Sequence, residues 1–185
     1  MNVIRRKVFV SYHHEDQYEV DKFIKAFDAK HDVFIARALG SAMNQDIIDS
    51  DDADYVMRRI RELYLSDSTV TIVLIGKCTW ARRYVDWEIQ ASLRHGAKTL
   101  PNGLLGIDLT SAGKKPTVPN RLDINLPLKD GTKRYALWYD YPSSTTSLAA
   151  WIEDAFMART DAARVKLINN PRERRMRSSP CPNNR

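Results

Sequence analysis

The hydrophobic pattern of the chain is clearest in residues 70–95. Val70 to Ile75 form a continuous apolar run that is rich in β-branched side chains, and Gly76 ends it. A short run of this kind predicts a strand that is buried on both faces of a sheet. From residue 80 to residue 95 the apolar spacing becomes helical. The pattern therefore predicts a strand, a turn and a helix in succession.

One residue of the predicted helix does not fit a purely structural role. Glu88 falls on the narrow stripe that also holds Val85, Ile89 and Ser92, at about 100° per residue. A carboxylate on the side of a helix that faces a sheet is costly to bury unless it is paired or used chemically. Tyr84 and Trp87 lie off this stripe and are candidates for a partner surface.

The remaining elements follow from the same reasoning. Four further strands are predicted at residues 7–12, 32–36, 104–109 and 135–139. Helices are predicted after Asp16 to about residue 29, from Asp52 or Asp54 to residue 64, and after residues 143–147, where the last helix contains Leu148 and Phe156. Two long connections remain, residues 37–52 and 110–134, and a connection of such length is usually functional or mobile.

Strands that alternate with helices predict an α/β fold with a parallel sheet and helices on both faces. We expect a flavodoxin-like, doubly wound, five-stranded sheet of order 2-1-3-4-5 in three layers, over residues 1–168. The site should lie beyond the carboxyl ends of strands one and three, where the strand order reverses. The segments predicted there are 11–15, 37–52 and 76–83.

The charge of the chain is concentrated in its C-terminal segment. The formal net charge is +6, and residues 164–185 alone hold seven Lys or Arg and one Glu. The preceding 163 residues carry 22 basic and 22 acidic side chains. We therefore expect residues 169–185 to be a basic, disordered tail and the domain not to be a nucleic-acid platform.

The apolar runs, the N-terminal residues and the cysteines indicate where the protein is located. No apolar run approaches the roughly 20 residues that span a bilayer, and the N-terminal residues lack the pattern of a signal peptide. Cys78 and Cys181 are the two cysteines, so no disulfide framework is implied. A cytoplasmic protein with reduced cysteines and no membrane partner is expected.

Several protein classes that share this fold are excluded, because the chain lacks the residues that their functions require. A phosphorelay receiver needs an acceptor Asp after strand three, where this chain has Gly76 and Lys77. A flavodoxin needs a phosphate loop rich in Ser, Thr and Gly after strand one, where this chain has SYHHED. Neither a Walker loop nor a dinucleotide glycine fingerprint is present.

Three segments resemble a known family. FVSYHHED after the first strand, TIVLIGKCTW and YVDWEIQASL together resemble the TIR-like family first defined on an archaeal protein, which includes the TIR proteins of bacterial Thoeris anti-phage systems. The resemblance covers roughly residues 5–160. It implies an enzyme that cleaves the nicotinamide–ribose bond of NAD, which is its substrate and not a cofactor, and releases a cyclic ADP-ribose-type signal for a separate effector. A homo-oligomer is also expected.

The resemblance implies that Glu88 is the catalytic residue. Its carboxylate would stabilise the ribosyl cation that forms on bond cleavage. The alternative is a structural role, in which Glu88 lies at the edge of the core and pairs with Arg82, Arg83 or another base. Ser11, Tyr12 and His13 are candidate substrate contacts at the end of strand one, although strand alternation turns Tyr12 away from Ser11.

Trp80 is a further candidate substrate contact, with a core anchor as its alternative role. No metal site is expected, because adjacent histidines should point apart and no ligand spacing completes a zinc set. Two other functions stay open at this point. One is a non-catalytic TIR scaffold that acts by self-association, and the other is a nucleoside deoxyribosyltransferase-like enzyme.

Overall fold

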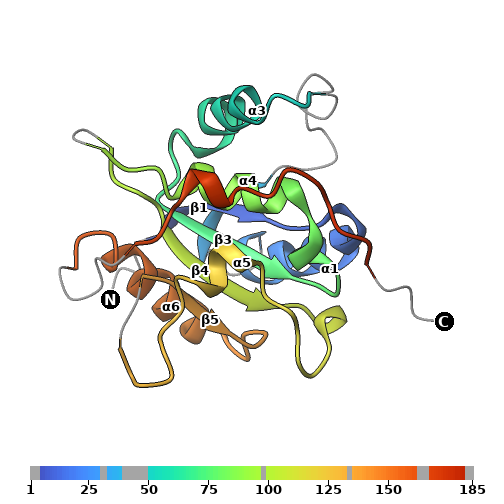
Figure 1. The fold of residues 1–185 in the computed structure, drawn as a ribbon. Coiled ribbons are helices and arrows are strands. Elements are labelled where there is room, and N and C mark those ends of the chain that lie inside the picture. Colours follow the sequence, from blue (N-terminus) through green and yellow to red (C-terminus); the bar gives the residue numbers. More distant parts are fainter. Residues whose placement is uncertain are drawn as a thin grey trace.

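The computed structural model describes residues 5–29, 33–38, 50–96, 99–132, 135–161 and 167–181 (Figure 1). Five parallel strands form one sheet of order β2-β1-β3-β4-β5. They are β1 (Arg6–Ser11), β2 (Phe34–Ala38), β3 (Val70–Ile75), β4 (Gly103–Asp108) and β5 (Leu137–Tyr139). The predicted fold class and strand order are confirmed.

Helices cover both faces of the sheet and complete three layers (Figure 1). The helices are α1 (Gln17–Ile24), α3 (Ala53–Ile60), α4 (Arg83–Ser92), α5 (Asn120–Asp123) and α6 (Thr145–Met157). One face packs against α1 and α6, and the other against α3, α4 and α5. Asp52 caps α3 by accepting hydrogen bonds from the backbone N–H groups of Asp54 and Tyr55.

The central strands alternate between the two layers of helices. Val8 and Val10 of β1 join the core beneath α1 and α6, whereas Phe9 packs under α3. All six residues of β3 are buried, as the continuous apolar run predicts. This alternation turns Ser11 toward the layer that contains α4 and Tyr12 toward the opposite layer.

Several element boundaries differ from the sequence predictions. The predicted helix of residues 80–95 is divided into a 3-10 turn (Thr79–Ala81) and α4, because Arg82 between them is extended at φ −97° and ψ 126°. The long connection 110–134 contains a 3-10 turn (Thr110–Ala112) and the short helix α5. Strand β2 begins two residues later than predicted, and β5 has three residues.

The C-terminal segment 167–181 is ordered along α4, in contrast to the predicted disorder of the tail from residue 169. It crosses α4 as the red trace in Figure 1. The indole Nε1 of Trp87 donates to the carbonyl of Arg175 at 2.8 Å, and the backbone N–H of Ser179 donates to the carbonyl of Ala81 at 2.8 Å. These contacts use polar groups without any periodicity, so the hydrophobic pattern could not reveal them.

Two further expectations about this region are corrected. Trp87 is fully buried between α3 and the C-terminal segment and does not form a surface for a partner. Cys78 and Cys181 form a disulfide with a Cα–Cα distance of 5.6 Å, whereas a chain with only two cysteines implied no disulfide framework. Among the helices that the structure describes, none has the length and apolar content needed to cross a bilayer.

Candidate active site at the carboxyl ends of β1 and β3

Glu88 and Ser11 meet at the point where the strand order reverses. Ser11 ends β1, and Glu88 lies on α4, which follows β3. The Ser11 hydroxyl donates a hydrogen bond of 2.5 Å to Glu88 Oε2. Ser11 is fully buried and Glu88 is 3% exposed. The sheet-facing stripe of α4 thus carries a carboxyl group to the place where doubly wound sheets hold their ligands.

Burial strongly affects the protonation of Glu88. Removal from water raises the pKa of its carboxyl group from 4.5 to about 8, and the hydrogen bond from Ser11 opposes this shift only in part. The carboxyl group is therefore mostly neutral at pH 7 in the ligand-free protein. A positive charge placed beside it would favour the ionised form and lower its pKa.

Tyr12, a candidate substrate contact after β1, points away from Glu88. The Tyr12 hydroxyl donates a 2.6 Å hydrogen bond to Gln17 Oε1, and its ring packs against the core on the α1 side. Burial raises the pKa of Tyr12, and the negative charge of Glu88 is a smaller contribution in the same direction. Tyr12 thus lies within the electrostatic reach of Glu88 although it faces the opposite layer.

His13 is held neutral. It is 4% exposed, and burial, followed by the positive charges of Arg82 and His14, lowers its pKa to about 4. Its Nε2 lies 3.2 Å from Glu15 Oε2 without the geometry of a hydrogen bond. A neutral imidazole at the edge of the site can offer either a donor or an acceptor nitrogen to a ligand.

The histidine pair does not point apart as the sequence reasoning assumed. The rings of His13 and His14 meet edge to face with centroids 4.3 Å apart. One ligand atom each from His13, His14 and Glu15 lies within 4.8 Å of the others. Such a set could approach a cation, but the positive charge of Arg82 acts on His13 and opposes cation binding there.

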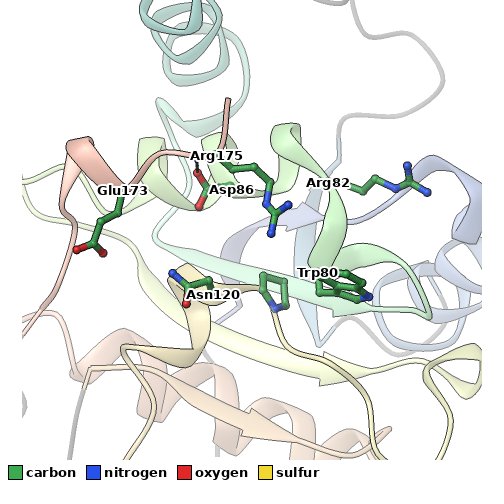
Figure 2. Close-up of a pocket in the computed structure, with 7 residues that line it drawn as sticks. Trp80, Arg82, Asp86, Asn120, Glu173 and Arg175 are labelled. Carbon is green, nitrogen blue, oxygen red and sulfur yellow. Dashed lines mark hydrogen bonds between the residues drawn. The ribbon is translucent and has the colours of Figure 1, made fainter. Parts of the chain in front are cut away.

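Trp80 lies at a different place from Glu88. It is half-buried and lines a pocket of about 250 Å³ formed with Arg82, Asp86, Pro119, Asn120, Glu173 and Arg175 (Figure 2). Asp86 borders this pocket, and two helical positions separate it from Glu88, which places the two side chains on opposite sides of α4. The structure therefore brings Ser11 and Glu88 together and does not bring Trp80 to them.

Asp16 is an acidic neighbour of the site that the sequence reasoning missed. Its half-buried carboxylate packs against Gly76 at the end of β3, in space that a Cβ atom would need. It accepts hydrogen bonds from Thr79 Oγ1 at 3.4 Å and Ser111 Oγ at 3.5 Å. Burial raises its pKa. The glycine that ends the apolar run was the available clue, because a close approach there requires a missing side chain.

Most of the predicted 37–52 loop cannot be compared with the prediction, because residues 39–49 lie outside the described residues. The described part of the site thus comes from the ends of β1 and β3 and from α4. These elements all belong to one continuous stretch of the chain that ends before α5.

Comparison with known proteins identifies the family. No curated protein matches the chain. The family model described as "Thoeris protein ThsB, TIR-like domain" matches residues 9–114. This range is more than half of the chain and runs from within β1 past β4, so it contains Ser11, Trp80 and Glu88. The chain belongs to the family of the TIR-like domain of the Thoeris protein ThsB.

Proposed function

We propose that the protein cleaves the bond between nicotinamide and ribose in NAD, with Glu88 as the catalytic carboxylate. The observation that carries the proposal is the buried Ser11–Glu88 pair at the carboxyl ends of the central strands. Membership of the Thoeris TIR-like family supports the same substrate. The site needs no cofactor for this reaction, because NAD itself supplies the leaving group.

The chemistry explains why a buried carboxyl group is useful. The nicotinamide ring of NAD is cationic, and bond cleavage moves positive charge to the ribose as an oxocarbenium-like ion. The approach of this charge favours the ionised form of Glu88, whose pKa of about 8 in the free protein is set by burial. The ionised carboxylate then stabilises the ribosyl cation in a medium that screens it weakly.

Ser11 acts as the positioning residue in this proposal. Its hydroxyl donates to Oε2 of Glu88 and so fixes the plane of the carboxyl group. Oε1 remains for the ribose hydroxyls or the ribosyl cation. Exclusion of water would also protect the cation until an intramolecular nucleophile captures it. The product of that capture would be a cyclic ADP-ribose-type signal for a separate effector in anti-phage defence.

The 3% exposure of Glu88 also has a second interpretation. A carboxyl group with so little access could serve only the packing of a TIR scaffold that acts by self-association. The catalytic proposal therefore requires the surroundings of Glu88 to open for NAD. The self-association expected of this family is compatible with both functions, since assembly can order a site. We place the enzyme in the cytoplasm, where NAD is present.

The test is NAD turnover by the purified full chain, followed by chromatography of nicotinamide and the ADP-ribose products. Glu88→Gln keeps the shape of the side chain and removes its charge, and we expect it to abolish turnover. Glu62→Gln is the matched control, because Glu62 is an exposed carboxylate paired with Arg59 outside the site. The same pair of variants is compared in phage-infected cells, where a trigger is present.

The outcomes separate the three functions. Nicotinamide release that depends on Glu88 supports the proposal. Turnover that survives Glu88→Gln contradicts the role of Glu88. Concentration-dependent assembly with no NAD turnover, even in infected cells, supports the scaffold. Exchange of bases between deoxynucleosides, with no action on NAD, supports a deoxyribosyltransferase-like enzyme.

A further inference from the structure

A second pocket lies on the outer side of α4, away from Ser11 and Glu88. Its volume is about 610 Å³, and its walls come from α3 and the π-helical segment Arg61–Leu65 after it, from the end of α4 and the residues that follow, and from the C-terminal segment. The residues that line it are Asp54, Met57, Arg58, Arg61, Gln90, Arg94, His95, Asn169, Pro171 and Arg174. In Figure 1 the C-terminal segment runs across α4, and its Arg174 contacts both Gln90 of α4 and Asp54 of α3.

The pocket is strongly cationic. Four arginines line it, and Asp54 is the single carboxylate among its described lining residues. Asp54 is paired with Arg174 at 3.0 Å, and its side chain is 83% exposed. No carboxylate lies within ion-pair distance of Arg58, Arg61 or Arg94 in the described part of the chain.

The arginines act on one another across the pocket. Burial lowers the pKa of Arg61, and the positive charge of Arg94 is the next largest cause. The negative charge of Glu62 opposes this shift, Arg58 lowers the pKa of Arg61 further, and Asp54 makes the smallest, opposing contribution. Guanidinium groups that repel each other at the wall of a cavity are stabilised by an anion that binds between them.

The wall made by the C-terminal segment is firmly held. Arg174 Nε donates to Gln90 Oε1 at 2.8 Å, and Asn169 Nδ2 donates to the carbonyl of Gln90 at 3.1 Å. The guanidinium group of Arg121, on α5, donates to Oδ1 of the same Asn169 at 3.1 Å. The sequence predicts that the basic C-terminal segment is a separate tail. In the structure its Arg174 instead lines the same cavity as the arginines of the domain.

We propose that this pocket binds a ligand with two or three linked phosphates, as in a nucleoside di- or triphosphate or an inorganic polyphosphate. Guanidinium groups pair with phosphate oxygens through two parallel hydrogen bonds, so several arginines suit several phosphates. A single phosphate would leave some of the arginines of the pocket uncompensated. The concave shape and the nearby Met57 and Pro171 favour a small ligand over the backbone of a nucleic-acid duplex.

The site does not depend on the proposed NAD cleavage. Glu88 projects toward the sheet, whereas the pocket lies on the opposite, outer side of the same helix. Binding can therefore be measured with ligands that have no nicotinamide. Failure of NAD turnover would leave the phosphate site standing, and absence of phosphate binding would leave the NAD proposal standing.

The experiment is calorimetric titration of the full chain with tripolyphosphate, ATP, adenosine and a short DNA duplex. We expect one saturable site for tripolyphosphate and for ATP, and none for adenosine. Tighter binding of ATP than of tripolyphosphate identifies a nucleotide as the ligand, and equal binding identifies the phosphate chain alone. Arg61→Gln combined with Arg94→Gln should weaken binding by about 10- to 100-fold, since two charge-assisted contacts are lost.

Arg59→Gln is the matched control, because Arg59 lies on α3 outside the pocket and pairs with Glu62. It should bind as the wild type does. The double variant should melt no lower than the wild type at low salt, because it removes two charges that repel each other. If the double variant is unfolded, Arg58→Gln at an exposed position replaces it in the comparison.

Three results would overturn the proposal. The first is the absence of saturable binding of both tripolyphosphate and ATP. The second is an equal affinity of the pocket variants and the Arg59→Gln control. The third is tighter binding of the DNA duplex than of tripolyphosphate, which would identify an open surface for nucleic acid.

Discussion

Asp86 and Glu88 lie two positions apart on α4 and project to opposite sides of it. Glu88 faces the sheet and receives the Ser11 hydroxyl. Asp86 faces outward, where its carboxylate accepts hydrogen bonds from the Arg121 guanidinium at 2.9 and 3.3 Å and from the backbone N–H of Arg175 at 2.9 Å. One helix thus carries an acid that has no cationic partner among the described residues and an acid that is fully paired. Mutations at the two positions should have opposite effects on stability.

Glu88→Gln should stabilise the protein at alkaline pH. The folded state raises the pKa of Glu88 from 4.5 to about 8, so the folded state binds its proton more tightly than the unfolded state does. The stabilising contribution of the neutral carboxyl group is fully present below pH 4.5 and is lost as the pH rises to about 8. The shift corresponds to on the order of 5 kcal/mol, which is an upper limit for the loss.

Urea unfolding at pH 5 and pH 9 measures this effect. Glu88→Gln should be close to the wild type at pH 5 and more stable at pH 9. Glu62→Gln, which changes an exposed carboxylate, should show no such difference. A wild-type stability that does not fall between these pH values, relative to Glu88→Gln, would contradict the burial of a carboxyl group with a raised pKa.

The rate of NAD cleavage should depend on the same ionisation. The proposed mechanism uses the carboxylate, so kcat/KM should rise with pH toward a plateau above about 8, the pKa of Glu88 in the free protein. Ser11→Ala removes the hydrogen bond that lowers this pKa, so the midpoint of the profile should move to higher pH. We expect Ser11→Ala to lower kcat/KM by about 10- to 100-fold at pH 7, from the lost hydrogen bond to the charged carboxylate.

The pH profiles of the wild type and Ser11→Ala are compared with that of Tyr12→Phe. Tyr12→Phe removes the hydroxyl that binds Gln17 and leaves the Ser11–Glu88 bond in place. Its midpoint should stay near that of the wild type. An unchanged midpoint in Ser11→Ala would show that Ser11 does not set the ionisation of Glu88.

The sheet could be predicted because its strands are short runs of apolar side chains. Val70 to Ile75 form a run that is buried on both faces, and the order of the strands follows from their alternation with helices. To predict that Ser11 pairs with Glu88 requires both this strand order and the apolar stripe of α4. Periodicity could identify Glu88 as unusual, but it could not identify its partner 77 residues away.

The contacts of the C-terminal segment could not be predicted in the same way. Trp87 looked exposed from the helical spacing, yet the carbonyl of Arg175 and the core under α3 bury it. Arginine, asparagine and backbone groups make these contacts, and such residues carry no hydrophobic period. The same limit hid the disulfide, because two cysteines in a sequence do not reveal whether the fold brings them together.

Loss of the Asp86 carboxylate should destabilise the protein. Arg121 is 2% exposed, and its guanidinium depends on both oxygens of Asp86. Asp86→Ala would leave this cation buried and would also remove the acceptor for the Arg175 N–H group. We expect a loss of about 3–5 kcal/mol in the free energy of unfolding.

Denaturant unfolding of Asp86→Ala and of the double variant with Arg121→Met measures this loss. The double variant removes both charges, so it should recover part of the stability. Asp51→Ala serves as the control, because Asp51 pairs with Arg83 at an exposed position. A loss no greater than that of Asp51→Ala would contradict the importance of the buried pair.

The disulfide between Cys78 and Cys181 should hold the C-terminal segment against α4. It closes a loop between residues 103 positions apart, and cross-links of this length restrict the unfolded chain strongly. Reduction, or Cys181→Ser, should therefore lower the free energy of unfolding by about 2–4 kcal/mol. It should also expose the segment from residue 176 onward to protease, because the bond anchors that segment at the turn that carries Trp80.

The experiment compares oxidised and reduced wild type with Cys181→Ser in denaturant unfolding and limited trypsin digestion. Cleavage after Arg177 should be slow in the oxidised protein and fast in the other two. The contacts of Arg174 with Gln90 and Asp54 lie nearer the domain, so cleavage after Arg174 should stay slow in all three. Two free thiols per chain in the protein as purified, with the same stability with and without reductant, would contradict a structural disulfide.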